Sequence, residues 1–336
     1  MDDTKYGTRN KRGDYTPNEP LEHAPLFAFP PKPRALLNWL PHYFLPWNLL
    51  WLASAFAWWA WIVPEAEVMK SLHWGWVLWL FAVNCVAVFL FYGAMELHLY
   101  IRRAQGTRFK YNAKWPAEHK SSAFLFQSQT KDSMIRAFGS GVPIWTGWQV
   151  LVLWAWANDV GPWVGLMDHP LYLFAVWLVL PVIHEFHFFV IHRLIHTPLL
   201  YKYVHSVHHN SVNPSPWSSL AMHPVEHLLY FATAAYHFIL PSHPLLAIYQ
   251  IHYAGFGAVV GHIGFDKIEV GEDKALESHA FAHYLHHKYF EVNYGDGLIP
   301  LDRWFGTWHD GSKDGDARMQ ARYERRKAKA NARANA

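Results

Sequence analysis

The chain has 336 residues, of which 52% are apolar and only 16% are Asp, Glu, Lys or Arg, whereas soluble globular proteins average about 25% charged residues. This composition excludes disorder for most of the chain, and the single cysteine excludes a disulfide scaffold. The formal net charge of +3 gives no reason to expect nucleic acid as a partner.

Long stretches without a charged residue predict helices that span a membrane. Residues 43–63, 72–95 and 137–158 contain no Asp, Glu, Lys or Arg. About 20 apolar residues, each adding about 1.5 Å of helix, cross a hydrocarbon core of about 30 Å. A fourth stretch, residues 169–191, is interrupted only by Glu185 and is predicted to be the fourth span.

A fifth uncharged stretch covers residues 227–265 and contains Pro241 and Pro244. Its two arms form either a membrane hairpin or a segment that dips into the bilayer and returns. We therefore predict an all-α integral membrane protein with about four transmembrane helices plus a membrane hairpin.

The chain divides into three predicted parts. Residues 1–42 are polar and rich in proline, contain no signal-peptide pattern, and are expected to form a cytosolic segment at the membrane surface. Residues 43–310 form the membrane domain, and residues 311–336 form a basic cytosolic tail.

The basic residues predict how the chain is oriented in the membrane. Lys and Arg are abundant in residues 1–42, in residues 102–136 and after residue 265, whereas residues 159–168 contain none. Because Lys and Arg favour cytoplasmic loops, both termini, the 102–136 loop and the segment 192–226 are predicted to be cytoplasmic.

Histidine is concentrated in one region, since 17 of the 24 histidines lie between residues 184 and 287. Three motifs stand out, namely HRLIH at 192–196, HSVHH at 205–209 and HYLHH at 283–287. Histidines three and four residues apart share one side of a helix, so each motif is expected to aim its imidazoles at one point. Imidazole suits Fe, Cu, Zn and Ni.

We predict metal ligation by the eight histidines of these motifs, and two ions rather than one, because one ion takes four to six ligands. The predicted ligands are His192, His196, His205, His208, His209, His283, His286 and His287. A pair of catalytic zinc ions would leave most of them unused. Two irons can share the electrons needed to split dioxygen. The scattered histidines are expected to be structural or surface residues: His23, His42, His73, His98, His119, His169, His237, His243, His252 and His309.

In this order the three motifs resemble the histidine boxes of the fatty acid hydroxylase/sterol desaturase superfamily, from about Glu185 to Trp308. The sequences SLAMHPVEH (219–227), HHKYFEVNYG (286–295) and LDRWFG (301–306) are most similar to sterol C-5 desaturases. The resemblance implies a non-haem di-iron centre, dioxygen, a cytosolic helical cap that holds the histidines, and an external electron donor such as cytochrome b5 or a ferredoxin. It also suggests His223 and His262 as further ligands.

Glu185 is predicted to support the metal site from behind the ligands. It lies seven residues before His192, so on a helix the two side chains share a face. Metal-bound histidines commonly donate their second N–H to a carboxylate, and Glu185 is the candidate for that role. His187 is expected to pack on another face, and His184 is ambiguous.

The leading interpretation is an oxygen-dependent lipid hydroxylase or desaturase, an oxidoreductase acting on a sterol or a fatty-acyl lipid. Box spacing does not distinguish the two outcomes. A non-catalytic haem membrane protein and a metal transporter are the alternatives from other classes. The sequence GHIG at 261–264 departs from the sterol enzymes, and no cytochrome b5 segment is fused. The endoplasmic reticulum and a bacterial inner membrane both fit.

Overall fold

Helices make up most of the computed structural model, which describes residues 1–116 and 120–334. The α-helices are α1 (Pro33–Phe44), α2 (Trp47–Trp61), α3 (Ala66–Met69), α4 (Trp74–Glu96), α5 (Gln129–Arg136), α6 (Val142–Ala157), α7 (Pro170–Ile195), α8 (Pro198–Leu200), α9 (Ser206–His209), α10 (Pro224–Phe231), α11 (Pro244–His262), α12 (Phe281–Tyr289), α13 (Leu301–Trp304) and α14 (Lys313–Ala334). Short 3₁₀ or π-helical turns are η1 (Asp3–Lys5), η2 (Pro25–Phe27), η3 (Leu97–Ile101), η4 (Leu125–Gln127), η5 (Ala137–Gly141), η6 (Tyr201–His205), η7 (Pro216–Leu220) and η8 (Ala232–Phe238).

Two helical stretches of the described chain are long and apolar enough to cross a membrane, Trp74–Ile101 and Pro170–Ile195. They correspond to the second and fourth predicted spans. The first and third uncharged stretches also form helices, but α2 has only 15 residues and α6 has 16. At about 1.5 Å per residue, each is shorter than a hydrocarbon core of about 30 Å. The π-helical turn η5 lengthens the third stretch at its start.

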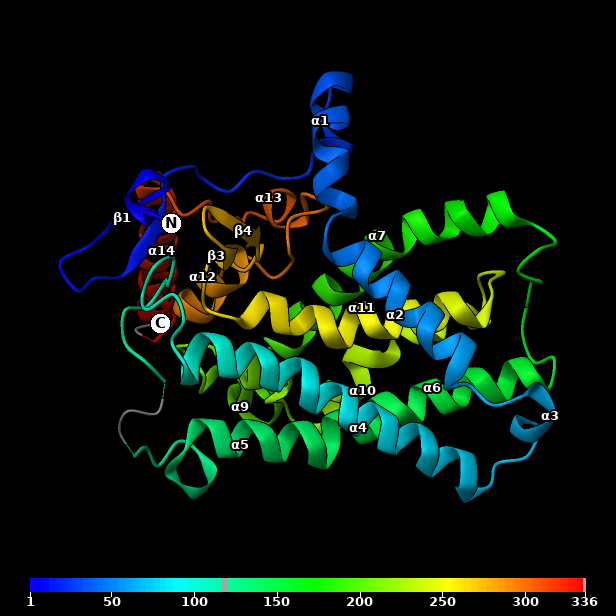
Figure 1. Cartoon of the computed structure of the whole chain (residues 1–336). Coiled ribbons are helices and arrows are strands. Elements are labelled where there is room, and N and C mark those ends of the chain that lie inside the picture. Colours follow the sequence, from blue (N-terminus) through cyan, green and yellow to red (C-terminus); the bar gives the residue numbers. More distant parts are fainter. Residues whose placement is uncertain (117–119, 335–336) are drawn as a thin grey trace.

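Helix α11 occupies the centre of the helical bundle, where it packs against α2, α6 and α7 (Figure 1). Almost all of its side chains are buried by protein. Gly255 allows α11 and the side chain of Trp145 on α6 to approach each other closely, because a Cβ atom at position 255 would lie 2.1 Å from the ring of Trp145. The carbonyl of Gly255 also accepts a hydrogen bond from Tyr92 on α4 at 2.6 Å. The second arm of the predicted hairpin is therefore a core helix.

A small subdomain, which we call the cap, lies at one end of the bundle, where Figure 1 also shows both chain termini. It consists of the two strand pairs described next and helices α12 to α14. It contains two antiparallel strand pairs, β1 (Gly7–Arg9) with β2 (Tyr15–Pro17) and β3 (Lys267–Gly271) with β4 (Lys274–Glu277). The all-α prediction omitted these pairs, because strands this short leave little periodic pattern in a sequence.

The loop that follows η3 lies against the N-terminal strands of the cap. The guanidinium of Arg9 donates to the carbonyl of Thr107 at 2.6 Å, and Tyr15 N donates to Tyr111 O at 3.1 Å. The turns that join α2 to α4 and α6 to α7 lie at the opposite end (Figure 1). The two ends of the bundle are consistent with the two groups of loops that the basic residues distinguish, and the orientation in a membrane stays a prediction. The domain boundaries stay predictions. The first, at residue 42, falls inside α1, and the second, at residue 310, falls between α13 and α14.

Candidate metal centre

All three histidine boxes meet at the junction between the bundle and the cap. Helix α7 supplies His192 near its C-terminal end, and His196 caps the same helix. The second box lies on η6 and α9, and the third lies on α12. Helix α11 adds a ninth imidazole, His262, at its last residue. The nine side chains form two neighbouring groups.

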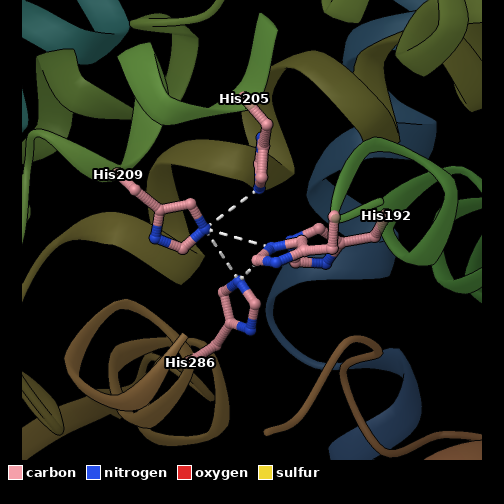
Figure 2. A group of neighbouring side chains, drawn as sticks. His192, His205, His209 and His286 are labelled. Atoms are coloured by element: carbon pink, nitrogen blue, oxygen red, sulfur yellow. Dashed lines mark hydrogen bonds between the residues drawn. The ribbon is translucent and has the colours of Figure 1, made fainter. Parts of the chain in front are cut away.

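The first group, the five-histidine cluster, consists of His192, His196, His205, His209 and His286. The Nε2 atom of His209 lies 3.0 Å from Nε2 of His205, 3.2 Å from Nε2 of His196 and 3.1 Å from Nε2 of His286. Figure 2 shows the rings of His205 and His286 turned toward that of His209.

The second group, the four-histidine cluster, consists of His208, His262, His283 and His287. Its centre is Nε2 of His262, which lies 3.2 Å from Nε2 of His208 and 3.0 Å from that of His283. The two clusters adjoin, since the ring centroids of His209 and His287 are 5.0 Å apart. His262, suggested by the resemblance, is therefore placed among the box histidines.

The second and third boxes each divide between the two clusters, contrary to the expectation that one box aims at one point. His205 and His209 enter one cluster and His208 the other, whereas His283 and His287 separate from His286. Around a helix, a residue four positions further on is rotated by about 40°, whereas a residue three positions further on is rotated by about 60° in the opposite direction. The second and third boxes can therefore each serve two nearby points.

The spacing of the nitrogen atoms fits metal ions. With a metal–nitrogen bond of about 2.1 Å, two ligands of one ion lie about 3.0 Å apart at a right angle and about 3.4 Å apart at a tetrahedral angle. The distances between neighbouring Nε2 atoms in the two clusters, 3.0–3.3 Å, fall within this range. The role of these histidines as ligands stays a prediction that this geometry supports.

Burial keeps the box imidazoles in the form that binds metal. Desolvation, followed by the neighbouring imidazoles, holds the pKa of His205, His209 and His286 well below the usual value of histidine. The same causes lower the pKa of His283 and His287. These rings are therefore neutral at pH 7 and each keeps a lone pair for a metal ion.

The outward-facing nitrogens of several rings are held by protein acceptors. His205 Nδ1 donates to Oε1 of Glu226 at 2.8 Å, and His286 Nδ1 donates to the carbonyl of Val292 at 2.6 Å. His192 Nδ1 donates to the carbonyl of Tyr294 at 2.8 Å. Each bond fixes the tautomer that leaves Nε2 free to face the cluster. Glu226 was missed in the sequence because it lies 21 residues from its partner.

Replacing Glu226 by Gln is expected to weaken metal binding by about 10–100-fold, the usual effect of losing a partner that orients a ligand. The amide oxygen can still accept from His205, but it lacks the negative charge that strengthens the bond. Competition with a chelator would measure the change. Glu226→Asp restores the charge at a shorter reach and should recover part of the affinity. An unchanged affinity in Glu226→Gln would show that this bond does not tune the ligand.

In the described chain, Glu185 does not hydrogen-bond to a predicted ligand in the way that the sequence suggested, but holds a loop beside the clusters. Its carboxylate accepts from the backbone N–H groups of Asp296 and Gly297 at 3.0–3.1 Å, and no hydrogen bond in the described chain joins it to a box histidine. Asp302 likewise accepts from the N–H groups of Tyr294 and Gly295. The two carboxylates hold the loop whose Tyr294 carbonyl orients His192.

Other predicted or ambiguous histidines lie outside both clusters. His223 is the N-cap of α10, where Nδ1 accepts from the N–H of Val225 at 3.2 Å. His187 packs on another face, as predicted, with Nε2 donating to the carbonyl of Leu229 at 2.9 Å. His237 is buried between Ser242 and Gln250. His119 falls outside the described residues.

A cavity of about 310 Å³ opens onto both clusters. Its lining includes His192 and His205 of the five-histidine cluster and His262 of the four-histidine cluster. Apolar side chains such as Phe188 and Ile191 of α7 form much of the remaining wall, together with residues from α1, α2 and α11. The wall is only partly apolar, since Glu22, Asn48 and Asp296 also line it, but it places hydrocarbon side chains directly beside the candidate metal sites.

Residues 177–307 match the fatty acid hydroxylase family. The resemblance that the three boxes carry is thereby confirmed over residues 177–307. The chain is 30% identical over 151 residues to Delta(7)-sterol 5(6)-desaturase ERG3A of Gibberella zeae and 32% identical over 129 residues to ERG3B of the same fungus. It is also 31% identical over 157 residues to Delta(7)-sterol 5(6)-desaturase erg3C of Aspergillus fumigatus.

These similarities are partial and distant. They cover 44%, 38% and 39% of this chain, and 39%, 39% and 49% of the respective relatives. The chain thus spans less than half the length of each of these sterol desaturases in the matched region. No solved structure is significantly similar.

Proposed function

We propose that this fatty acid hydroxylase homologue is an oxygen-dependent di-iron enzyme that hydroxylates or desaturates a C–H bond of a membrane lipid. The observation that carries the proposal is the opening of one cavity, lined in part by large apolar side chains, onto two adjoining histidine clusters. Both clusters offer only the neutral nitrogen atoms of histidine rings as ligands. Such ligands suit iron.

Two bound irons would supply the reduction of dioxygen and the removal of hydrogen from an unactivated C–H bond. The residues of the chain prepare that chemistry. Glu226, Val292 and Tyr294 fix the ring orientations of three ligands through Nδ1. Phe188 and Ile191 bind the hydrocarbon and keep water from the reacting carbon.

Two kinds of reaction on a membrane lipid fit the proposed enzyme. The named relatives are sterol desaturases, which supports a dehydrogenation of the sterol C-5 type as one form of it. Hydroxylation of a sterol or a fatty-acyl lipid is the other form. Both begin by removing one hydrogen, so the cavity alone does not separate them.

The geometry disfavours the two alternatives from other classes. A haem held by two histidines needs Nε2 atoms about 4 Å apart on opposite sides of its iron, whereas neighbouring Nε2 atoms here are 3.0–3.3 Å apart. A metal transporter places polar ligands along its spans near the midplane. Here the boxes lie where α7 ends and the cap begins.

Lipid profiling of a host with and without the chain tests the function, together with metal analysis of the purified protein. We expect iron in both clusters and a new lipid whose mass differs by +16 for hydroxylation or −2 for desaturation. Full activity with stoichiometric zinc instead of iron would refute the oxidative chemistry.

The proposal includes four membrane helices, formed by the stretches around α2, α4, α6 and α7, with the metal centre on the cytoplasmic face. A membrane of the endoplasmic reticulum or a bacterial inner membrane fits. Tags at the N-terminus, within residues 102–136 and at the C-terminus are expected to report the cytoplasm. A tag within residues 161–167 should report the other side. A C-terminal tag on the far side would contradict this orientation.

A further inference from the structure

Each turnover of the proposed enzyme needs two electrons from outside the substrate. Hydroxylation converts a C–H bond, dioxygen, two electrons and two protons into an alcohol and one water. Desaturation consumes the same electrons and protons and yields an alkene and two waters. A route for electrons from the surface to the clusters must therefore exist, and two features of the cap mark one.

The first feature is a positively charged hollow of about 480 Å³ between α14 and the segment that includes α13. Four arginines line it, Arg303, Arg318, Arg322 and Arg325, against a single carboxylate. That carboxylate, Asp310, is paired with Arg318 at 3.0 Å. The other three arginines form no ion pair within the described chain, so the hollow carries an excess of positive charge.

The second feature is the short connection from this hollow to the five-histidine cluster. Val292 lines the hollow, and its carbonyl accepts the hydrogen bond from His286 Nδ1 at 2.6 Å. Arg322 donates to the carbonyl of the preceding residue, Glu291. One hydrogen bond therefore separates the wall of the hollow from a predicted metal ligand.

Aromatic rings form a second connection beside the first. Phe305 is 61% exposed, and the guanidinium of Arg193 lies 5.4 Å from its ring centroid and 5.1 Å from that of Tyr294. The ring of Tyr294 in turn lies 4.9 Å from that of His196 and 5.4 Å from that of His286. The rings of Phe305 and Tyr294, with the guanidinium of Arg193 between them, thus lead from the surface to two predicted ligands.

From these features we propose that the hollow is the docking site of an acidic, one-electron redox protein, which delivers two electrons in succession through the Val292–His286 hydrogen bond. The inference rests on the proposed function. Charge complementarity favours an acidic partner. The extent of this surface fits a protein partner. Arg318, Arg322 and Arg325 follow one face of α14 over about two turns. The exposed aromatic residues Trp304 and Phe305 follow Arg303 in the sequence. Arginine and large aromatic residues are enriched at protein interfaces.

The test uses the full chain in detergent and two acidic probes, the haem domain of cytochrome b5 and a plant-type ferredoxin. The variant is Arg303→Glu combined with Arg325→Glu. Arg303 donates no side-chain hydrogen bond within the described chain, and Arg325 donates only to Ala321 of its own helix, so the fold should persist. Lys70→Glu at the C-cap of α3, at the opposite end of the molecule, is the control (Figure 1).

We expect at least one probe to bind the wild-type chain. Because salt screens exposed charges, this binding should weaken as the salt concentration rises tenfold, from about 20 to about 200 mM. The double variant should bind at least about tenfold more weakly and oxidise the pre-reduced probe correspondingly more slowly. Lys70→Glu should match the wild type. Unchanged binding and electron transfer in the double variant would overturn the proposal. So would a loss confined to binding of anionic lipid vesicles, which would make the patch a membrane contact.

The binding measurement does not depend on catalysis, so the two failures can be told apart. If the wild-type chain oxidises lipid with a chemical reductant but the arginine variant binds the probes normally, the docking site is wrong and the function stands. If the chain holds no iron and oxidises no lipid, yet the variant loses the probe, the docking surface stands and the function is wrong.

Discussion

Replacing His286 by Ala is expected to abolish lipid oxidation and to lower the iron content from about two per chain to about one or fewer. The Nε2 atom of His286 lies 3.1 Å from those of His196 and His209, and its Nδ1 atom is tied to Val292. The substitution therefore removes one nitrogen donor from the five-histidine cluster. Metal analysis and lipid profiling of the same preparation would measure both losses.

The control for this substitution is His223→Asn. Asn is a good N-cap, so it can replace the acceptor that His223 provides to Val225 at the start of α10. Iron and activity should remain normal, because His223 lies outside both clusters. Retained iron and activity in His286→Ala would refute the site, and a loss of iron in His223→Asn would restore that residue as a ligand.

Replacing Gly257 by Phe is expected to abolish oxidation while iron content stays normal. Gly257 lies on α11 and lines the cavity, and a Cβ atom there would have only an ordinary contact, 3.9 Å from the ring nitrogen of Trp51. A benzyl group added at this position would take up space in the cavity that the lipid needs. Iron content, binding of a lipid analogue and product formation would be measured together.

Gly257→Ala is the matched control, because a single methyl group fits the same space and alanine favours helix over glycine by about 1 kcal/mol. It should keep near-normal activity. Product formation by Gly257→Phe at the wild-type rate would show that the lipid does not occupy this cavity. Loss of iron in Gly257→Phe would point to a damaged fold instead, and the alanine variant would then show whether α11 tolerates any change.

The sequence was most informative where chemistry leaves a local signature. The histidines of HRLIH, HSVHH and HYLHH are close together in the chain, so their spacing was enough to predict that they gather. The division of HSVHH between two clusters was not predictable, because it depends on where α7, α11 and α12 lie around α9. Glu226 and Asp302 were missed for the same reason, since their partners are fixed only by the fold.

The fold was predictable in outline for a similar physical reason. Absence of charge identifies helices that avoid water, and it located α4 and α7 within a few residues. It could not tell burial in lipid from burial in protein. The stretch from 244 to 262 is as free of charge as the spans, yet α11 is enclosed by other helices, as the contact of Gly255 with Trp145 shows.

The sharing of α9 and α12 between both clusters has a consequence for how the centre assembles. A metal ion bound by His283 and His287 fixes the same short helix that carries His286, and one bound by His205 and His209 fixes the helix that carries His208. Occupancy of one cluster therefore preorganises the other. Iron uptake by the metal-free protein should be cooperative, with a sigmoidal titration and few chains that hold a single ion.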